Sequence, residues 1–121
     1  SYQGVSVPGF PNFFLTSGPY TFGVNWYDML ETNMHFIIRV MKKAREEGAT
    51  LVDVDQKAHE KHYKVLQKRA LNAVQLAPGC ATSNSYYIDR NGEFSLGAVF
   101  SPLHRWIMAR IASLRGYNFS K

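Results

Sequence analysis

Apolar positions spaced three and four residues apart predict one long helix in this chain. The helix spans about residues 26–47, and Gly48 is a natural C-terminal stop. One face carries Met29, Leu30, Asn33, Met34, Ile37 and Met41. Phe36, Ile38 and Val40 widen the apolar surface beyond the stripe that a single core contact requires. The pattern therefore predicts a helix with apolar side chains left over for a second contact.

A short apolar run before this helix predicts a buried strand. Residues 12–17 are β-prone, and Pro11 and Gly18 bound them. The centre of the run is apolar on both faces, which is typical of a strand inside a parallel sheet. A turn-rich connection over residues 18–23 then leads into the helix.

The rest of the chain alternates helical and β-like segments. Residues 50–54 predict a short strand, and residues 56–77 a second helix that Pro78 and Gly79 end. Arg90-Asn91-Gly92 predicts the turn of a β-hairpin between residues 85–89 and 94–100.

Ser101 and Pro102 are a favourable N-cap and first residue for a last helix, which runs to about Leu114. The predicted fold class is α+β. It is one small domain with a long helix after an N-terminal strand, a second helix, a β-hairpin and a C-terminal helix.

Composition indicates an ordinary globular chain. Of 121 residues, 45% are hydrophobic and 19% charged, and the net charge is +5. This charge suits an anionic partner such as a nucleotide phosphate, but the basic residues are spread over three predicted helices. Four of them gather late in the long helix, where cations complement the helix dipole: Arg39, Lys42, Lys43 and Arg45. No nucleic-acid partner is predicted.

Compartment and membrane association also follow from composition. No segment reaches the ~20 continuous apolar residues of a bilayer span. Cys80 is the only cysteine, so an intrachain disulfide is excluded and a reducing, cytoplasmic setting is expected.

Familiar catalytic and metal motifs are absent from the sequence. It contains no GxGxxG and no P-loop. His59 and His62 are three residues apart on a predicted helix but lack ligand partners at zinc-site spacing, so no metal is predicted. Ser101 and His104 share a helical turn, but capping accounts for Ser101. No catalytic residue is predicted within the chain.

The start of the long helix is the one arrangement of chemical interest. It follows Gly18-Pro19 and begins near Asn25 and Trp26. A helix N-terminus offers free N–H donors and partial positive charge, and at the carboxyl end of a parallel strand it suits an anionic or polar ligand. A plain strand-to-helix turn with no ligand explains the same residues equally well.

Residues 9–19, Gly-Phe-Pro-Asn-Phe-Phe-Leu-Thr-Ser-Gly-Pro, resemble the closing strand of the FAD domain in Baeyer–Villiger monooxygenases and related flavin-containing monooxygenases. In that family the strand passes beneath the flavin and the N-terminus of the next helix meets the isoalloxazine ring. The resemblance implies that Gly18, Pro19, Asn25 and Trp26 border the cofactor.

Later segments extend the resemblance over nearly the whole chain. Residues 83–89 are similar to the family's Ser-Trp-Tyr segment, whose aromatic, here Tyr86, lies near the nicotinamide cofactor and the substrate. Phe22 falls on the expected substrate side. His104-Arg105-Trp106 and residues 116–119 are similar to the last helix and tail. Trp26 is larger than expected beside flavin, and Tyr86 stands where Trp is common, so substrate preference is left open.

The resemblance implies the C-terminal segment of an FAD- and NADPH-dependent monooxygenase that inserts oxygen into a ketone. Residues 1–48 would end the FAD domain, and residues 49–121 would be a C-terminal extension. Both dinucleotide fingerprints and the catalytic arginine would lie outside this chain. Alone it is therefore expected to bind neither FAD nor NADPH, to be inactive without the remainder of the parent enzyme, and to self-associate. The alternative is an independent α+β binding or oligomerisation module without catalysis.

Overall fold

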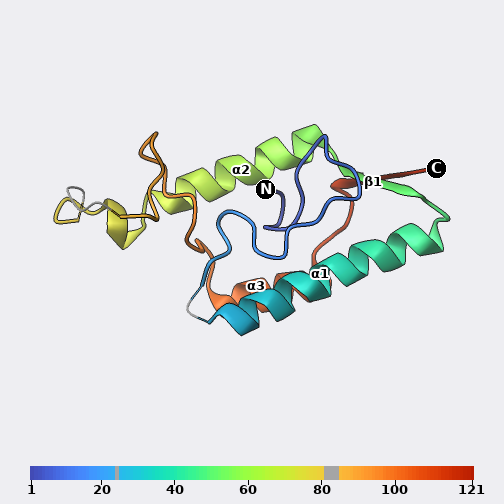
Figure 1. The fold of residues 1–121 in the computed structure, drawn as a ribbon, viewed down its shortest axis with the longest axis horizontal. Coiled ribbons are helices and arrows are strands. Elements are labelled where there is room, and N and C mark those ends of the chain that lie inside the picture. The colour runs from blue at the N-terminus through green and yellow to red at the C-terminus, as the bar shows by residue number, and fades with distance from the viewer. Residues whose placement is uncertain (24, 81–84) are drawn as a thin grey trace.

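Three α-helices and a two-stranded antiparallel sheet form the regular structure of the described residues (Figure 1). The computed structural model describes residues 1–23, 25–80 and 85–121. The elements are α1 (Trp26–Glu46), β1 (Leu51–Val54), α2 (Gln56–Ala70), a 3-10 turn (Val74–Leu76), α3 (Pro102–Ile111) and β2 (Tyr117–Ser120). The chain is a small α+β domain, as its sequence predicts.

The boundaries of α1 follow its capping residues. Asn25 has an extended backbone, and its Oδ1 accepts a hydrogen bond from the Tyr27 N–H. Asp28 lies in the first turn and Arg45 in the last, which suits the helix dipole at both ends. Gly48 adopts a φ of +63° just beyond the helix. The predicted long helix is confirmed almost to the residue.

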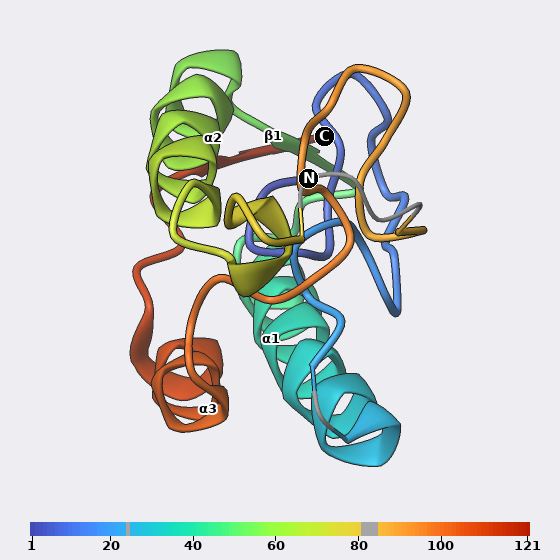
Figure 2. The ribbon, with the colours of Figure 1, turned by 90° about the vertical axis from the view of Figure 1, so that its left-hand side faces the viewer.

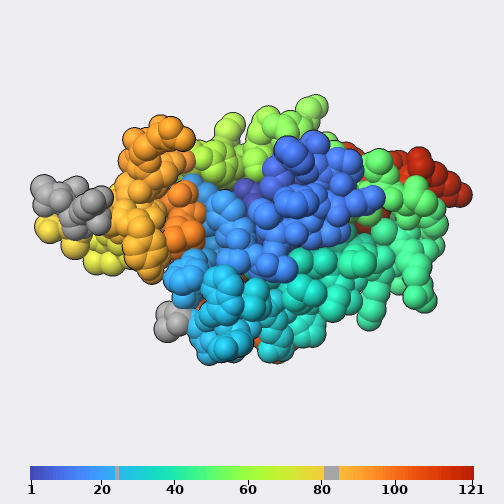
Figure 3. Space-filling model, in the orientation of Figure 1, coloured from blue at the N-terminus to red at the C-terminus, as the bar shows by residue number. Residues whose placement is uncertain are grey.

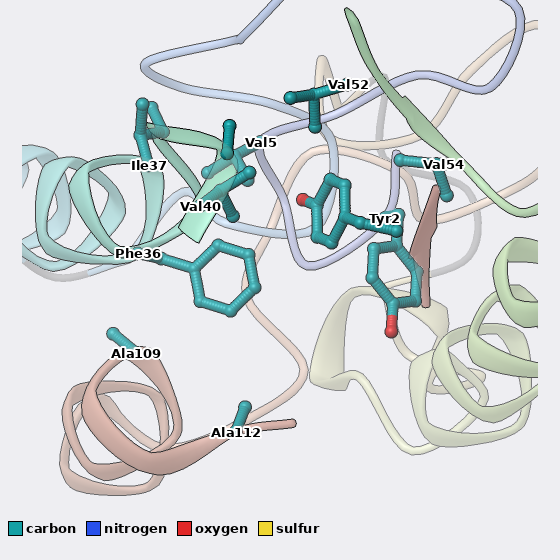
Figure 4. Close-up of a cluster of buried hydrophobic side chains, with 11 residues drawn as sticks. Tyr2, Val5, Phe36, Ile37, Val40, Val52, Val54, Ala109 and Ala112 are labelled. Carbon is teal, nitrogen blue, oxygen red and sulfur yellow. The ribbon is translucent and has the colours of Figure 1, made fainter. Parts of the chain in front are cut away.

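The main core lies under α1. Phe36, Ile37 and Val40 of α1 point toward Tyr2 and Val5 of the N-terminal segment (Figure 4). The same cluster includes Ala44, Val52, Val54, Ala109, Ala112 and Tyr117. It therefore combines residues from both predicted segments, 1–48 and 49–121.

The N-terminal segment fills the space between α1 and α2. In Figures 1 and 2 it runs between these two helices, while α3 packs against α1 from another side. Its side chains cover that space in the space-filling view (Figure 3). Residues 1–22 therefore act as a packed layer of the domain, although they contain little regular structure.

The prediction of a strand over residues 12–17 is wrong. In this stretch only Phe14 forms a β-bridge, an isolated one with Ser6. Asn12 has a φ of +58°, which breaks an extended run, and the Phe13 side chain is 51% exposed. Asn12 instead serves β1, because its Oδ1 accepts from the Val52 N–H at 2.9 Å and its Nδ2 donates to the Thr50 carbonyl. A tertiary contact replaces the predicted strand.

The expected β-hairpin is present only as its turn. The Asp89 side chain accepts hydrogen bonds from the N–H groups of Asn91 and Glu93, and Gly92 has a φ of +80°. Only one isolated bridge, Ile88 to Phe94, joins the two arms. The Ser95 N–H also donates to the Tyr87 carbonyl, but Leu96 and Ala98 bond with Phe22, so the pairing of the two arms does not continue into two strands.

The tail and the later helices also differ from expectation. β2 was not predicted, yet its register runs from Val54 opposite Tyr117 to Leu51 opposite Ser120. α2 ends at Ala70 rather than near residue 77, and α3 ends at Ile111 rather than near residue 114. The predicted capping of α3 is confirmed, since Ser101 Oγ accepts from the His104 N–H.

Candidate functional site

Aromatic side chains from three segments gather beside the N-terminus of α1. The ring centroids of Phe22 and Trp26 are 5.9 Å apart, and those of Phe22 and Tyr87 are 6.2 Å apart. Tyr86 stacks on Tyr87 at 4.4 Å, and Phe94 stacks on Tyr87 at 6.0 Å. We call these five residues the aromatic wall. It joins residues that lie more than 60 positions apart in the chain.

Backbone hydrogen bonds fix the two loops that carry the wall. The Phe22 N–H donates to the Leu96 carbonyl, and the Ala98 N–H donates to the Phe22 carbonyl at 2.8 Å. The Tyr20 N–H donates to the Ser95 carbonyl. Residues 20–22 thus form a short extended contact with residues 95–98, which holds Phe22 against the loop of Tyr87.

A carboxylate on this loop ties it to α2. Glu93 accepts a hydrogen bond from the Tyr63 hydroxyl at 2.8 Å and from Gln67 Nε2 at 3.4 Å. The bond to Glu93 raises the pKa of Tyr63, so its hydroxyl keeps its proton at any physiological pH. Likewise, the hydrogen bond with Tyr86 raises the pKa of Tyr87. The phenol of Tyr87 in the wall is therefore neutral near pH 7.

A cavity of about 570 Å³ opens against the aromatic wall. Phe22, Tyr87, Phe94 and Phe100 supply its aromatic side, and Arg69 contributes a guanidinium that lies 4.5 Å above the Phe100 ring. A mostly apolar cavity with a few polar groups is the usual form of a small-molecule site.

A second groove of about 530 Å³ separates the N-termini of α1 and α3. Asn25 lines it, and Asp28 and Glu31 bring carboxylates to it. These two carboxylates outnumber the one guanidinium that lines the groove, that of Arg105, so the net charge disfavours a phosphate, whereas an uncharged ring meets no such repulsion. The groove thus does not offer the anion site that a bare helix N-terminus would.

The predicted site residues fall into two groups. Phe22, Asn25 and Trp26 lie around the start of α1. Tyr86 is placed at the outer end of the aromatic wall and is 74% exposed, while its neighbour Tyr87 makes the direct contact with Phe22. Ser83 and Asn84, which also carried the resemblance, lie outside the described residues.

Gly18 and Pro19 lie apart from the wall. The Gly18 N–H donates to the Gly4 carbonyl, and a Cβ on Gly18 would come within 2.3 Å of that carbonyl oxygen. Glycine is thus required there for the close approach of two backbone segments. Pro19 lines a smaller cavity between the helices rather than either opening at the start of α1.

Sequence reasoning missed a polar link through the middle of the domain. Arg105 Nη1 donates to the Thr21 carbonyl at 2.8 Å, and its Nη2 donates to Asn33 Oδ1 at 2.6 Å. Asn33 Nδ2 in turn donates to the Thr16 carbonyl at 2.7 Å. One signal was visible in the sequence: Asn33 is the polar residue on an otherwise apolar helix face.

The two histidines on α2 have aromatic partners. His59 stacks on Tyr63, and His62 meets the Tyr2 ring edge-on at 5.3 Å. Burial lowers the pKa of His62 to about 4, so it is neutral at pH 7. No group of three or more His, Cys, Asp or Glu among the described residues is placed to hold a metal ion.

None of the described helices is long and apolar enough to cross a membrane.

No protein-family model matches the chain, and no curated protein matches it significantly in sequence.

Proposed function

We propose that this chain is the C-terminal part of an FAD- and NADPH-dependent monooxygenase of the Baeyer–Villiger type. In this proposal the enzyme acts in the cytoplasm on a small ketone. Bound FAD, reduced by NADPH, supplies the oxygen chemistry, and the residues of this chain shape one wall of the site. The observation that carries the proposal is the aromatic wall, which unites Phe22, Trp26 and Tyr86 beside the start of α1.

The residues present fit part of such a cofactor. The aromatic wall and the cavity of about 570 Å³ offer flat apolar surface for a ring system or a ketone. In the adjoining groove the carboxylates of Asp28 and Glu31 outnumber the guanidinium of Arg105, which disfavours a pyrophosphate there. The proposal therefore assigns the nucleotide part of FAD, and NADPH, to the remainder of the enzyme. Phe22 and Tyr87 would exclude water and orient the substrate, with Tyr86 supporting Tyr87.

Gly18 and Pro19 take a different role in this proposal. Gly18 lets the chain approach the backbone of Gly4 in the N-terminal turn closely, since its position admits no side chain. Asn25 caps α1 and so fixes the direction of Trp26. These residues would position the cofactor side of the wall through the backbone.

The decisive experiment uses the full gene product that contains this chain. We expect a yellow protein whose absorbance reports bound FAD, and NADPH oxidation that depends on an added ketone and yields the ester. Phe22→Ala and Tyr87→Ala should raise KM for the ketone while the FAD content is retained. Phe10→Ala is the matched control, because Phe10 is an exposed aromatic outside the wall. A purified gene product that contains no FAD, or that shows no ketone-dependent NADPH oxidation, would refute the proposal.

A second candidate is an α+β module that binds copies of itself. A stripe of exposed apolar side chains runs along α1, beside the face that builds the core: Tyr27, Met34, Ile38 and Met41. Two such stripes packed antiparallel would place Glu31 of one copy beside Lys42 of the other, on both sides of the two-fold axis. This charge complementarity favours a second copy as the occupant.

Light scattering with a FAD titration separates the two candidates. Both expect a dimer of the isolated chain, which Ile38→Lys on the stripe should dissociate. Val65→Lys is the matched control, because Val65 on α2 is 44% exposed and Ile38 is 43% exposed. A dimer that does not bind FAD and whose gene product is inactive favours the module. A monomer that binds FAD tightly contradicts both candidates.

A further inference from the structure

A cavity of about 120 Å³ lies where α1, α2 and α3 face the N-terminal segment. Its lining includes Arg105 from α3 and two histidines, His62 and His104. None of the described residues that line it is an aspartate or a glutamate. The cavity is thus bordered by one fixed positive charge and no negative one.

Among the described residues, the guanidinium of Arg105 hydrogen-bonds to neutral acceptors. The Thr21 carbonyl and Asn33 Oδ1 take one N–H from each terminal nitrogen, and a guanidinium has five N–H groups in all. Burial lowers the pKa of Arg105, but arginine remains protonated in proteins. A largely buried charge whose described hydrogen-bond partners are neutral is costly to bury, so an anion in the cavity would be favoured.

Part of the cavity lining is apolar. Phe36, Leu66, Met108 and Ala109 contribute to it. An engineered apolar cavity of roughly 150 Å³ in another protein holds benzene, so about 120 Å³ suits a molecule of roughly four to six heavy atoms. The space thus fits a small anion that has an apolar end.

We propose that this cavity binds a short-chain monocarboxylate, with its carboxylate against Arg105 and its hydrocarbon end toward Phe36 and Met108. Planar carboxylates match the fork geometry of arginine, and two parallel N–H···O bonds give both strength and orientation. The proposal is independent of the proposed function, because the cavity is distinct from the one at the aromatic wall.

The first test compares butyrate with butyramide, which has the same shape and no charge. We expect butyrate to bind once per chain and about ten-fold or more tighter than butyramide at equal ionic strength. Methyl NMR of methionine reports the location. The Met108 signal should shift with butyrate, whereas the signal of Met41, exposed on α1, should not. Equal affinity for the two ligands, no saturable binding of either, or an unshifted Met108 signal would overturn the proposal.

Two further measurements define what recognises the ligand. Arg105→Lys keeps the positive charge but loses the two parallel N–H donors of the guanidinium. We expect this variant to bind butyrate about ten-fold more weakly. Arg110→Lys is the matched control on the same helix, since Arg110 stacks on Trp106 outside the cavity. The comparison of butyrate with butyramide uses the wild-type protein, so it tests the proposal even if Arg105→Lys fails to fold. Inorganic phosphate that bound as tightly as butyrate would refute the apolar half of the site.

Discussion

Asn33 sits on the buried face of α1 with its side chain 1% exposed, and it connects three segments through two hydrogen bonds. Asn33→Leu keeps a similar volume but removes both bonds. It leaves the Thr16 carbonyl and one N–H of the Arg105 guanidinium without their partner. A bond to a charged group contributes about 1.5–3 kcal/mol, and an unsatisfied buried carbonyl costs about 1–3 kcal/mol. After the gain from burying leucine, we expect a loss of about 3 kcal/mol in the free energy of unfolding.

Urea unfolding at fixed protein concentration measures this loss, with the fluorescence of Trp26 and Trp106 and far-UV circular dichroism as probes. With an m value of about 2 kcal/mol/M, the midpoint should fall by roughly 1.5 M. His35→Leu is the matched control on the same helix, because His35 is exposed and makes only a 3.6 Å contact with Glu31. We expect it to change stability by less than about 0.5 kcal/mol. Equal losses in the two variants would refute the role given to the Asn33 link.

Two further predictions concern α3 and α2. Ser101→Ala removes the side chain that accepts from the His104 N–H, so unfolding should become easier by about 1 kcal/mol in the same urea assay; an unchanged midpoint would contradict the cap. His62 gains a proton near pH 6.5 in an unfolded chain, but its pKa in the fold is about 4, so the unfolded state binds more protons between these values. Stability should therefore fall as the pH drops from 6.5 toward 4, and His62→Gln should flatten this part of the profile; identical pH slopes for variant and wild type would contradict the buried, neutral His62.

Local signals in the sequence determined the helices. The apolar spacing of α1, its start after Asn25 and its end before Gly48 are properties of one continuous segment. Ser101 and Pro102 likewise specify the start of α3, and the capping hydrogen bond spans only three residues of the chain, from Ser101 to His104. Helix hydrogen bonds join residues four apart, so nearby residues contain most of the information needed to predict them. The α+β class follows from the same local signals.

The β-like segments were decided by contacts between distant residues. The apolar run at residues 12–17 has strand composition, yet Asn12 bonds to Val52, and the run turns away from an extended path. Leu96 and Ala98 bond with Phe22 rather than continuing the hairpin, and the tail pairs with β1. A strand needs a partner, and no local pattern states which partner is available.

The candidate site divides in the same way. The sequence singled out Phe22, Asn25, Trp26 and Tyr86 as candidates, together with Gly18 and Pro19, but it did not predict the hydrogen bonds of Asn33. Only the tertiary structure placed Tyr87 rather than Tyr86 against Phe22, and set Gly18 against the backbone of the N-terminal turn. It also brought Arg105 to Asn33 across 72 positions of chain. Side-chain type is written in the sequence, but the direction in which a side chain points depends on the packing around it.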